Sequence, residues 1–454
     1  MVMLVEELKD DYMVHIKELV KKVFPQLRCL YRCLQKGKFK IVKRYLIYTA
    51  PTKQLKKIQS LKDKRIIRCV IMVHAANTFR DSVYQSLVKS GRFEVYLVAC
   101  PDCGHGVENM VRWINATYEY LKGKGYPNVI MGYDVNRNEI YEIKRNLEPD
   151  VVFFSSPYRS YIGEINYITK MRDCLCIYIP YYYNNTVEYK MAYDELLHNI
   201  VWRYYVETNW HKEMSKKYSS NNARNVVVTG YPGVDKFYDK QYIPSDDNWR
   251  IKDKKHKRII WAPHQTINPK KEMYYSAFLL IAEDMIELAE KYKDYIQIAF
   301  KPHPLLFNTL SKEWGKERTE TYYEKWRSME NTSIVDGEYV DLFLTSDAII
   351  HDSASFITEY LMLNKPALRT CNGRDLKTQF NEFSLACLNC YYMAYNGNDI
   401  ETFIKNVIDG RDPMLEKRTT FIKDHLLPPN DRLSSENIVN DILDSIDNQI
   451  LYHN

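Results

Sequence analysis

Three short segments in the second half of the chain combine the side chains that phosphate chemistry requires. They are Trp261-Ala262-Pro263-His264, Lys301-Pro302-His303-Pro304 and His351-Asp352-Ser353-Ala354-Ser355. An imidazole can take up or release a proton near neutral pH, and an ammonium group, serine hydroxyls and free backbone N–H groups can bind phosphate oxygens. We therefore expect one phosphate site that these segments share. Two alternatives stay open: each histidine taken alone is more often structural, and Ser353 or Ser355 could merely cap a helix.

Each of the three segments follows a run of apolar residues that predicts a buried strand. The strand patterns cover residues 258–262, 296–300 and 348–350, and helical patterns cover 277–292, 309–328 and 356–363. Apolar strands that alternate with helices indicate a parallel sheet covered on both faces. Because ligands of such sheets bind beyond the carboxyl ends of the strands, the three segments should converge on one rim.

The first half of the chain has the same alternation of strands and helices. Its strand patterns cover residues 66–73, 93–99, 129–131, 149–154, 175–179 and 226–228. Each half therefore predicts a doubly wound α/β domain. Two facing Rossmann-like domains of this kind, with a basic helical extension at the N-terminus, make up the GT-B fold that we expect.

The sequence divides into five predicted parts. They are a basic amphipathic helical extension (1–62), an N-terminal Rossmann-like domain (63–235), a polar linker (236–257), a C-terminal Rossmann-like domain (258–430) and a C-terminal helix (431–454). A chain of 454 residues is too long for one ordinary core, which agrees with two main domains.

Positive charge is concentrated near the N-terminus. Between His15 and Arg68 there are 17 Lys and Arg residues against Glu18 and Asp63, although the whole chain has a formal net charge of only +6. A basic amphipathic helix can bind an anionic membrane surface, and each basic residue then contributes about 1 kcal/mol. The alternative is a helical extension with a solvated basic face. We expect no nucleic-acid partner, because the sequence has no recognisable nucleic-acid-binding motif.

The spacing of the cysteines and the lack of a long apolar run indicate the cellular compartment. Ten cysteines without framework spacing predict reduced thiols. The sequence lacks an apolar run of about 18 residues and a secretory signal. We therefore expect a cytoplasmic protein that is peripheral on the inner face of the cell membrane. Cys100/Cys103 and Cys387/Cys390 have C-x-x-C spacing but fall in different predicted domains, so we expect no metal and no other cofactor.

Four further motifs, added to the three segments above, make up a resemblance to a known family. These four motifs are Gly230-Tyr231-Pro232, Glu359-Tyr360-Leu361, Asn364-Lys365-Pro366 and Ser434-Ser435-Glu436-Asn437-Ile438. Over residues 225–440 the chain resembles the CDP-glycerol glycerophosphotransferases, the family of teichoic-acid and capsule polymerases of the cell envelope. It is similar, more distantly, to bacterial sialyl- and polysialyltransferases.

The resemblance implies an activity. A GT-B enzyme of this family would move a glycerol-phosphate-type group from a CDP-activated donor to a hydroxyl of a cell-surface glycan or lipid-linked acceptor, and would release CMP. The C-terminal domain would bind the donor nucleotide and the N-terminal domain the acceptor. Two alternatives stay open: a GT-B glycosyltransferase with a CMP-sugar or another nucleotide-sugar donor, and a non-catalytic glycan- or nucleotide-binding component of a capsule assembly complex.

The resemblance also implies roles for individual residues. The catalytic candidates are His303, His264 and His74, and the donor-binding candidates are Lys301, His351, Asp352, Ser353, Ala354, Ser355 and Glu359. His303 and the serines would contact the donor phosphates, and Glu359 would bind a ribose or glycerol hydroxyl. The family commonly has a Trp-His-Gly-Thr-Pro segment in the N-terminal domain, whose histidine is thought to be the base. The nearest segment here, Tyr178–Asn184, has no histidine, which leaves His74 and His264 as candidates for the base.

Overall fold

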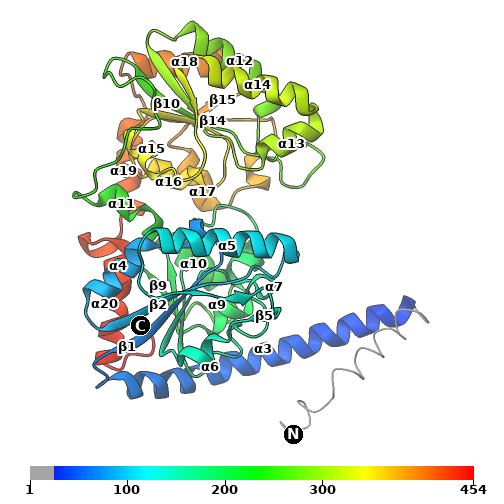
Figure 1. The fold of residues 1–454 in the computed structure, drawn as a ribbon, viewed down its shortest axis with the longest axis vertical. Helices are drawn as coiled ribbons and strands as arrows, with labels where there is room; N and C mark the ends of the chain where they lie inside the picture. The colour runs from blue at the N-terminus through cyan, green and yellow to red at the C-terminus, as the bar shows by residue number, and fades with distance from the viewer. Residues whose placement is uncertain (1–24, 454) are drawn as a thin grey trace. The chain divides into compact units, whose positions relative to one another are not determined.

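The computed structural model describes residues 25–453, with side chains from Phe39 onward (Figure 1). The part of the predicted amphipathic extension that lies within residues 1–24 is outside this range. The chain divides into a segment up to Lys53 and a unit from Gln54 onward. Helix α3 (Pro25–Leu61), which contains Pro51, begins in the first and ends in the second.

A seven-stranded parallel sheet forms the N-terminal domain. Its strands, in chain order, are β1 (Ile67–Val73), β2 (Phe93–Ala99), β3 (Val129–Met131), β6 (Val151–Phe154), β7 (Leu175–Tyr178), β8 (Arg203–Val206) and β9 (Val226–Val228). In space they follow the order β3-β2-β1-β6-β7-β8-β9. A two-stranded antiparallel sheet of β4 (Tyr133–Asp134) and β5 (Glu139–Ile140) lies outside it. The strand order reverses at β1, which places a switch point between β1 and β6.

A six-stranded parallel sheet forms the C-terminal domain. Its strands are β10 (Lys257–Ala262), β11 (Ile296–Phe300), β12 (Thr332–Ile334), β13 (Ala348–His351), β14 (Ala367–Thr370) and β15 (Tyr392–Ala394). Their spatial order is β12-β11-β10-β13-β14-β15, so the switch point lies between β10 and β13. Both sheets are doubly wound, and the predicted α/β fold of two Rossmann-like domains is confirmed.

Helices connect the strands of both sheets. Those before β10 are α4 (Asp81–Lys89), α5 (Val107–Gly123), α6 (Ile143–Leu147), α7 (Arg159–Ile162), α8 (Tyr189–Tyr193), α9 (Leu196–Ile200), α10 (Asn209–Tyr218) and α11 (Asp235–Tyr238). Those after β10 are α12 (Phe278–Lys291), α13 (Leu306–Glu313), α14 (Lys316–Ser328), α15 (Val340–Thr345), α16 (Phe356–Leu361), α17 (Glu382–Leu388), α18 (Gly397–Ile408), α19 (Leu415–His425) and α20 (Ser434–Asp447). The predicted helix over 309–328 is two helices, α13 and α14.

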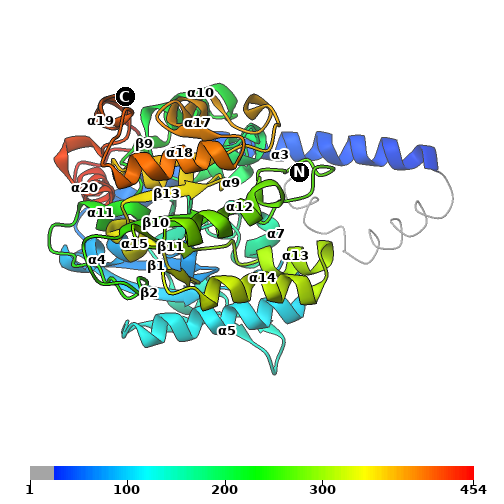
Figure 2. The same ribbon diagram turned by 90° about the horizontal axis from the view of Figure 1, so that it is seen from above.

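Alternate residues of the C-terminal strands enter two different cores. Ile259 and Trp261 of β10 pack with α12, α14 and α18 on one face of the sheet, as the two ribbon views also show (Figures 1 and 2). Ile260 and Ala262 pack with α15, α16 and α17 on the other face. This is the two-residue alternation of a strand that is buried on both faces.

The last helix of the chain completes the first domain. Helix α20 packs against α4, and Ile438, Val439, Ile442 and Ile446 belong to the same core as β1 and β2. The amino end of α20 is also held there, because the Asp235 carboxylate accepts hydrogen bonds from the backbone N–H groups of Ser434 (2.9 Å) and Ser435 (3.0 Å). The sequence predicts this helix but not the domain to which it belongs.

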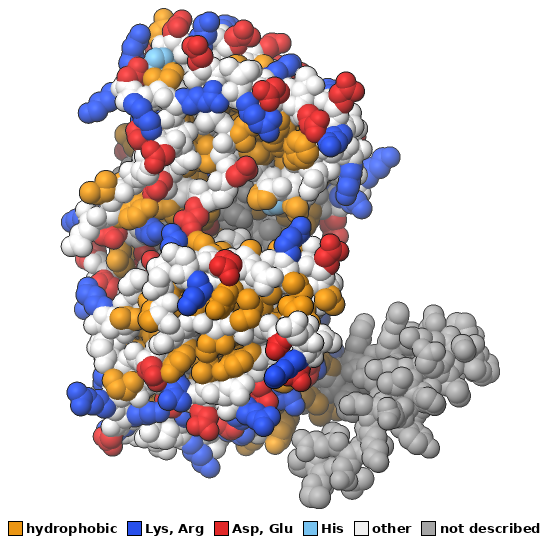
Figure 3. All heavy atoms as spheres, viewed as in Figure 1, with side chains coloured by type: hydrophobic (Ala, Val, Ile, Leu, Met, Phe, Trp, Pro, Cys, Tyr) orange, Lys and Arg blue, Asp and Glu red, His pale blue; other side chains and the backbone are white. Residues whose placement is uncertain are grey.

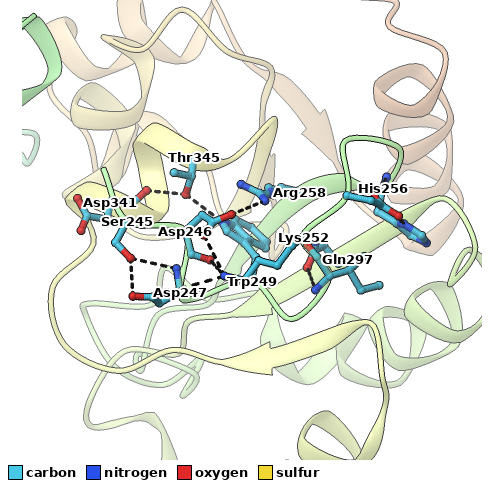
Figure 4. A network of polar contacts seen from close by, with 12 residues as sticks. Ser245, Asp246, Asp247, Trp249, Lys252, His256, Arg258, Gln297, Asp341 and Thr345 are labelled. Carbon is cyan, nitrogen blue, oxygen red and sulfur yellow. Dashed lines mark hydrogen bonds and ion pairs between the residues drawn. The ribbon is translucent and has the colours of Figure 1, made fainter. Parts of the chain in front are cut away.

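The predicted linker is an irregular strap that is attached to the C-terminal domain (Figure 4). Asp246 pairs with Arg258 (2.9 Å) and with Lys252 (2.9 Å), and Trp249 Nε1 donates to Thr345 Oγ1 at 2.8 Å. The side chain of Gln297 exchanges two hydrogen bonds with the backbone of Ile251. The strap therefore has a defined path over this domain.

The distribution of surface charge and the hydrophobicity of the helices are the two features that bear on charged partners and on membranes. On the face shown in Figure 3, Lys and Arg side chains alternate with Asp and Glu over the described residues, and no large area carries a single sign of charge. In the part of the chain that the structure describes, no helix is both long enough and apolar enough to cross a membrane.

Candidate functional site

The structure brings the three predicted segments together at the switch point of the C-terminal sheet. His303 N donates a hydrogen bond to Pro263 O at 3.0 Å, and the rings of His264 and His303 are 4.8 Å apart between centroids. His264 N donates to Asp352 Oδ1 at 2.6 Å. The loops after β11, β10 and β13 are thus connected by direct contacts, as expected for neighbouring parallel strands.

The two neighbouring histidines differ in their hydrogen-bonding pattern. Leu305 N donates to His303 Nδ1 at 3.2 Å. A ring nitrogen that accepts a hydrogen bond carries no proton, so the neutral His303 ring carries its proton on Nε2 and can donate it. His264 Nδ1 lies 2.9 Å from Thr266 Oγ1 and 3.3 Å from Thr266 N, and these contacts are compatible with either tautomer of its ring.

Burial keeps both imidazoles neutral. It lowers the pKa of His264 to about 3, with smaller contributions from His303 and Arg369. Burial also lowers the pKa of His303. At neutral pH the pair consists of two uncharged N–H donors, which suits the oxygens of an anionic group.

Asp352 lies beneath the rim that the three loops form, and it connects the loops by hydrogen bonds. It is 1% exposed. Its Oδ1 accepts from His264 N, and its Oδ2 accepts from Ser276 Oγ (2.9 Å), Ala277 N (2.9 Å) and Thr370 Oγ1 (3.3 Å). These four hydrogen bonds occupy both carboxylate oxygens. The geometry gives Asp352 the task of positioning the loops, whereas its predicted contact with a donor stays a prediction.

Lys301 directly follows β11 and is mostly buried. Its ammonium group donates to Gly337 O at 2.7 Å. Burial lowers its pKa to about 8, while Asp336 acts in the opposite direction. Lys301 is therefore still largely charged at neutral pH, two residues before His303 in the same loop.

The serine turn lies between β13 and α16. Ser353 and Ala354 are half-buried and Ser355 is exposed. Within the described part of the chain, Ser355 stands at the N-cap of α16 without a side-chain cap hydrogen bond. The helix-capping alternative is thus not realised by Ser355. Helix α16 has only six residues, so the serine hydroxyls rather than the helix dipole are the groups that this turn offers.

Two of the predicted donor-binding side chains lie beneath this rim. His351 is the last residue of β13 and is completely buried, with its ring packed against Phe356 and Tyr391. Glu359 is 2% exposed, and burial raises its pKa to about 7, while Tyr339 and Arg80 act in the opposite direction. Strand alternation explains the position of His351, because it lies on the same face as Ile349. Their predicted contacts with a ligand stay predictions.

His74 lies at the corresponding switch point of the N-terminal sheet. Its Nδ1 is 3.1 Å from Ser155 Oγ, at the end of β6. Burial lowers its pKa to about 4, and Asp102 raises it slightly. Among the described residues, His74 Nε2 has no hydrogen-bond partner. If Nδ1–H donates to Ser155, Nε2 is the nitrogen that can accept a proton.

Sequence reasoning missed the residues that connect the two domains at the serine turn. Asn185 Nδ2 donates to Ala354 O at 2.8 Å, and Asn185 Oδ1 accepts from Ser384 Oγ at 2.8 Å. Within the N-terminal domain, Arg80 Nη2 donates to Tyr231 Oη at 2.7 Å and to Tyr181 O at 2.5 Å. The sequence signal for these contacts was the position of Tyr181 and Asn185 in the segment that follows a predicted strand.

The C-x-x-C pairs lie apart in the structure. Cys100 is buried and Cys103 exposed at the end of β2, whereas Cys387 and Cys390 are buried at the end of α17. Over the residues that the structure describes, no group of three or more His, Cys, Asp or Glu side chains could hold a metal ion.

Known proteins resemble this chain in sequence. The teichoic acid ribitol-phosphate polymerase TarK of Staphylococcus aureus (strain NCTC 8325 / PS 47) is 24% identical over 265 residues, which are 55% of this chain and 46% of the relative. The chain therefore spans about half the length of the curated relative that it matches.

Solved structures resemble it in fold. The wall teichoic acid polymerase TagF has a TM-score of 0.56 at 13% identity, covering 94% of this chain and 100% of that chain. A second TagF structure, soaked with CDPG, has a TM-score of 0.54 at 13% identity over 95% and 100% of the two chains. A UDP-N-acetylglucosamine 2-epimerase has a TM-score of 0.51 at 14% identity, covering 84% of this chain and 96% of that chain. At these identities the likeness concerns the fold.

The family is defined by a match that includes the whole site in the C-terminal domain. The matching family is described as CDP-Glycerol:Poly(glycerophosphate) glycerophosphotransferase, and the matched residues are 184–444. They include Asn185, the three segments and most of helix α20. Because this match covers more than half of the 454 residues, the chain belongs to the CDP-Glycerol:Poly(glycerophosphate) glycerophosphotransferase family.

Proposed function

We propose that the chain transfers a polyol phosphate, of the glycerol or ribitol type, from a CDP-activated donor to a hydroxyl of a cell-surface glycan or lipid-linked acceptor. The observation that carries the proposal is the pair of neutral imidazoles of His264 and His303, which lie side by side at the switch point of the C-terminal sheet. Membership of the family and the similarity to a teichoic acid ribitol-phosphate polymerase support the choice of substrate class.

The reaction is a phosphoryl transfer. The acceptor oxygen loses its proton to a base and forms a bond to the β-phosphorus of the donor. The bond between that phosphorus and the oxygen bridging to the α-phosphate breaks, and CMP leaves with the electron pair. His264 and His303 donate hydrogen bonds to the phosphoryl oxygens, Lys301 adds positive potential, and the hydroxyls of Ser353 and Ser355 complete the phosphate contacts.

We assign the base to His74. The Nδ1 atom of His303 accepts a backbone hydrogen bond, so its Nε2 atom carries the proton and cannot accept one. Burial lowers the pKa of His264 to about 3, below the value of about 4 for His74, which makes His264 the weaker base of the two. His74 has its Nδ1 beside the Ser155 hydroxyl and its Nε2 without a partner among the described residues. With a pKa of about 4, the His74 imidazole is unprotonated at neutral pH, as a base must be.

We also propose that transfer needs no metal ion. The carboxylate of the rim, Asp352, is already occupied by four hydrogen bonds from the protein. Charge on the phosphoryl oxygens is compensated by N–H and ammonium groups instead.

CMP release tests the proposal. Purified full-length protein should release CMP from CDP-glycerol or CDP-ribitol when a lipid-linked or glycan acceptor is present. His303→Ala should lower kcat by about 100-fold or more, the effect of losing one preorganised hydrogen-bond donor to a transition-state oxygen. His256→Ala is the matched control, because His256 lies before β10, at the opposite edge of the sheet, and pairs with Asp253. No CMP from either donor, together with turnover of CMP-sialic acid, would favour the glycosyltransferase alternative.

We further propose that residues 15–68 hold the protein on the anionic inner face of the cell membrane. On α3 the side chains of Phe39, Ile41 and Tyr48 are 50%, 71% and 82% exposed, and Lys40 and Arg44 are exposed on the same helix. Exposed apolar and basic groups together suit an interface with acidic lipids. The protein should sediment with phosphatidylserine vesicles at low salt and less at high salt. Equal sedimentation with neutral vesicles would contradict an electrostatic attachment.

A further inference from the structure

Partly exposed aromatic rings gather at the carboxyl edge of the N-terminal sheet. This aromatic platform consists of Trp113, Tyr158, Tyr161, Tyr181 and Tyr182, all half-buried. Trp113 belongs to α5, Tyr158 and Tyr161 to the region of α7, and the last two follow β7 (Figure 1). Aromatic side chains of this kind usually enter the core, so five of them left partly open at one edge indicate a surface that binds something.

The rings form a continuous series. His105 connects two of them, with its ring 5.2 Å from Trp113 and 5.1 Å from Tyr161 between centroids. Tyr161 is 5.3 Å from Tyr158 between ring centroids, and the Tyr158 side chain lies close to that of Tyr182. Tyr181 and Tyr182 are 4.7 Å apart.

Polar groups of one loop lie beside the aromatic platform. The Asp102 carboxylate accepts from Gly104 N at 2.8 Å and lies 3.1 Å from His105 Nδ1. Gly104 allows the loop to lie on Tyr161, since a Cβ atom at this position would be 2.6 Å from Tyr161 Cδ1. Ring faces next to a carboxylate and an imidazole are the groups that bind the CH face and the hydroxyls of a sugar.

The charges near the platform do not favour an anion. Arg159 Nε donates to Glu164 at 2.7 Å, so this positive charge is paired with a carboxylate. Asp102 itself would repel a phosphate. A chain of glycerol phosphates would therefore meet a paired cation and an acidic carboxylate here, whereas an uncharged ring would meet no repulsion.

A short stretch of chain leads from the aromatic platform to a residue that contacts the serine turn of the C-terminal domain. Tyr181 is four residues before Asn185, whose side chain donates to Ala354 O in the serine turn at 2.8 Å. Four residues span at most about 14 Å, so a sugar on the platform can present a hydroxyl toward the turn.

We propose that the aromatic platform binds an uncharged sugar ring of the acceptor, so that the group receiving the polyol phosphate belongs to a glycan rather than to a polyol phosphate chain. This inference rests on the proposed function, because it names the acceptor of the same reaction.

Calorimetric titration of the full-length protein with two uncharged disaccharides, cellobiose and N,N′-diacetylchitobiose, and with a glycerol phosphate trimer tests the inference. At least one disaccharide should bind, and Tyr161→Ala should weaken binding roughly tenfold. Tyr161→Phe should keep most of the affinity. Gly104→Ala should also weaken it, because the added Cβ displaces the Tyr161 ring. Tyr295→Ala, at an exposed tyrosine of the C-terminal domain, is the matched control.

Two outcomes would overturn the inference. Neither disaccharide binds, or the trimer binds more tightly and its affinity depends on Tyr161. CMP release from the CDP-linked donor with the trimer as acceptor, in the same preparation, would then leave the proposed transferase activity standing. Conversely, Tyr161-dependent disaccharide binding without any CMP release would contradict the proposed activity and support the platform.

Discussion

Asp352→Ala should disconnect the loops of the candidate site. The substitution removes the acceptor of four hydrogen bonds at a position that is 1% exposed. The hydroxyls of Ser276 and Thr370 can rotate toward other acceptors, but the backbone N–H groups of His264 and Ala277 cannot. Two buried donors without partners cost about 1–3 kcal/mol each, and relief of the carboxylate's own desolvation offsets part of this. We therefore expect a net loss of about 3 kcal/mol.

For a domain of this size such a loss corresponds to a fall in melting temperature of roughly 6–12 °C. Differential scanning calorimetry measures it, and CMP release measures the accompanying rise in KM for the CDP-linked donor, because His264 loses its anchor. Ser276→Ala removes only one of the four hydrogen bonds and should cost about 1 kcal/mol. A melting temperature within 2 °C of wild type, with an unchanged donor KM, would refute the view that Asp352 holds these loops together.

Three further predictions concern charge. Stability should be greatest near pH 6.5, as thermal melts between pH 4 and 9 can test. Four buried histidines have pKa values that burial lowers to about 3 or 4, namely His74, His211, His264 and His351. Below about pH 6.5 the unfolded chain binds more protons at these groups, so stability falls on acidification. Burial raises the pKa of two glutamates, Glu207 to about 8 and Glu359 to about 7. Above pH 6.5 the folded state holds their protons more tightly, so stability falls as the pH rises toward 8. A monotonic profile would contradict this account. Asp441→Asn should destabilise the protein by about 3–5 kcal/mol in the same melts, because it removes the negative charge that pairs with the completely buried Arg203 guanidinium at 2.8 Å. An unchanged melting temperature would show that the guanidinium is otherwise stabilised. Finally, EDTA should not slow CMP release, and a loss that Mg²⁺ restores would contradict metal-independent transfer.

Local apolar runs in the sequence were sufficient to predict most of the strands in both sheets. Strands β2, β3 and β11 have the predicted bounds, because each is a short, mostly apolar run; β11 is completely buried, β2 is mostly buried and β3 is partly buried. Strand β8 was missed because Arg203 and the tyrosines beside it interrupt the apolar pattern. Arg203 is completely buried there, since Asp441, Ser445 and the carbonyl of Leu451 accept its hydrogen bonds. These partners are about 240 residues away in sequence, so no local pattern could reveal them.

The position of the candidate site was predicted from the sequence, but which of its side chains face outward and which lie beneath them was not. Consecutive strand ends were enough to place His264, His303 and Asp352 on one rim. Which of the neighbouring side chains face outward depends on strand alternation and on the helices packed above. His351 therefore lies beneath α16, although its place in the sequence is beside the serine turn.

The closing helix α20 has a consequence for biosynthesis. The N-terminal sheet emerges from the ribosome early, yet four residues of its core, Ile438, Val439, Ile442 and Ile446, are translated only after the whole C-terminal sheet. Until they arrive, the apolar surface beside α4 has no cover and is a place where nascent chains can associate or chaperones can bind. A chain truncated within the strap would keep this surface permanently open, so the two halves cannot be produced as independent, stably folded pieces by cutting there.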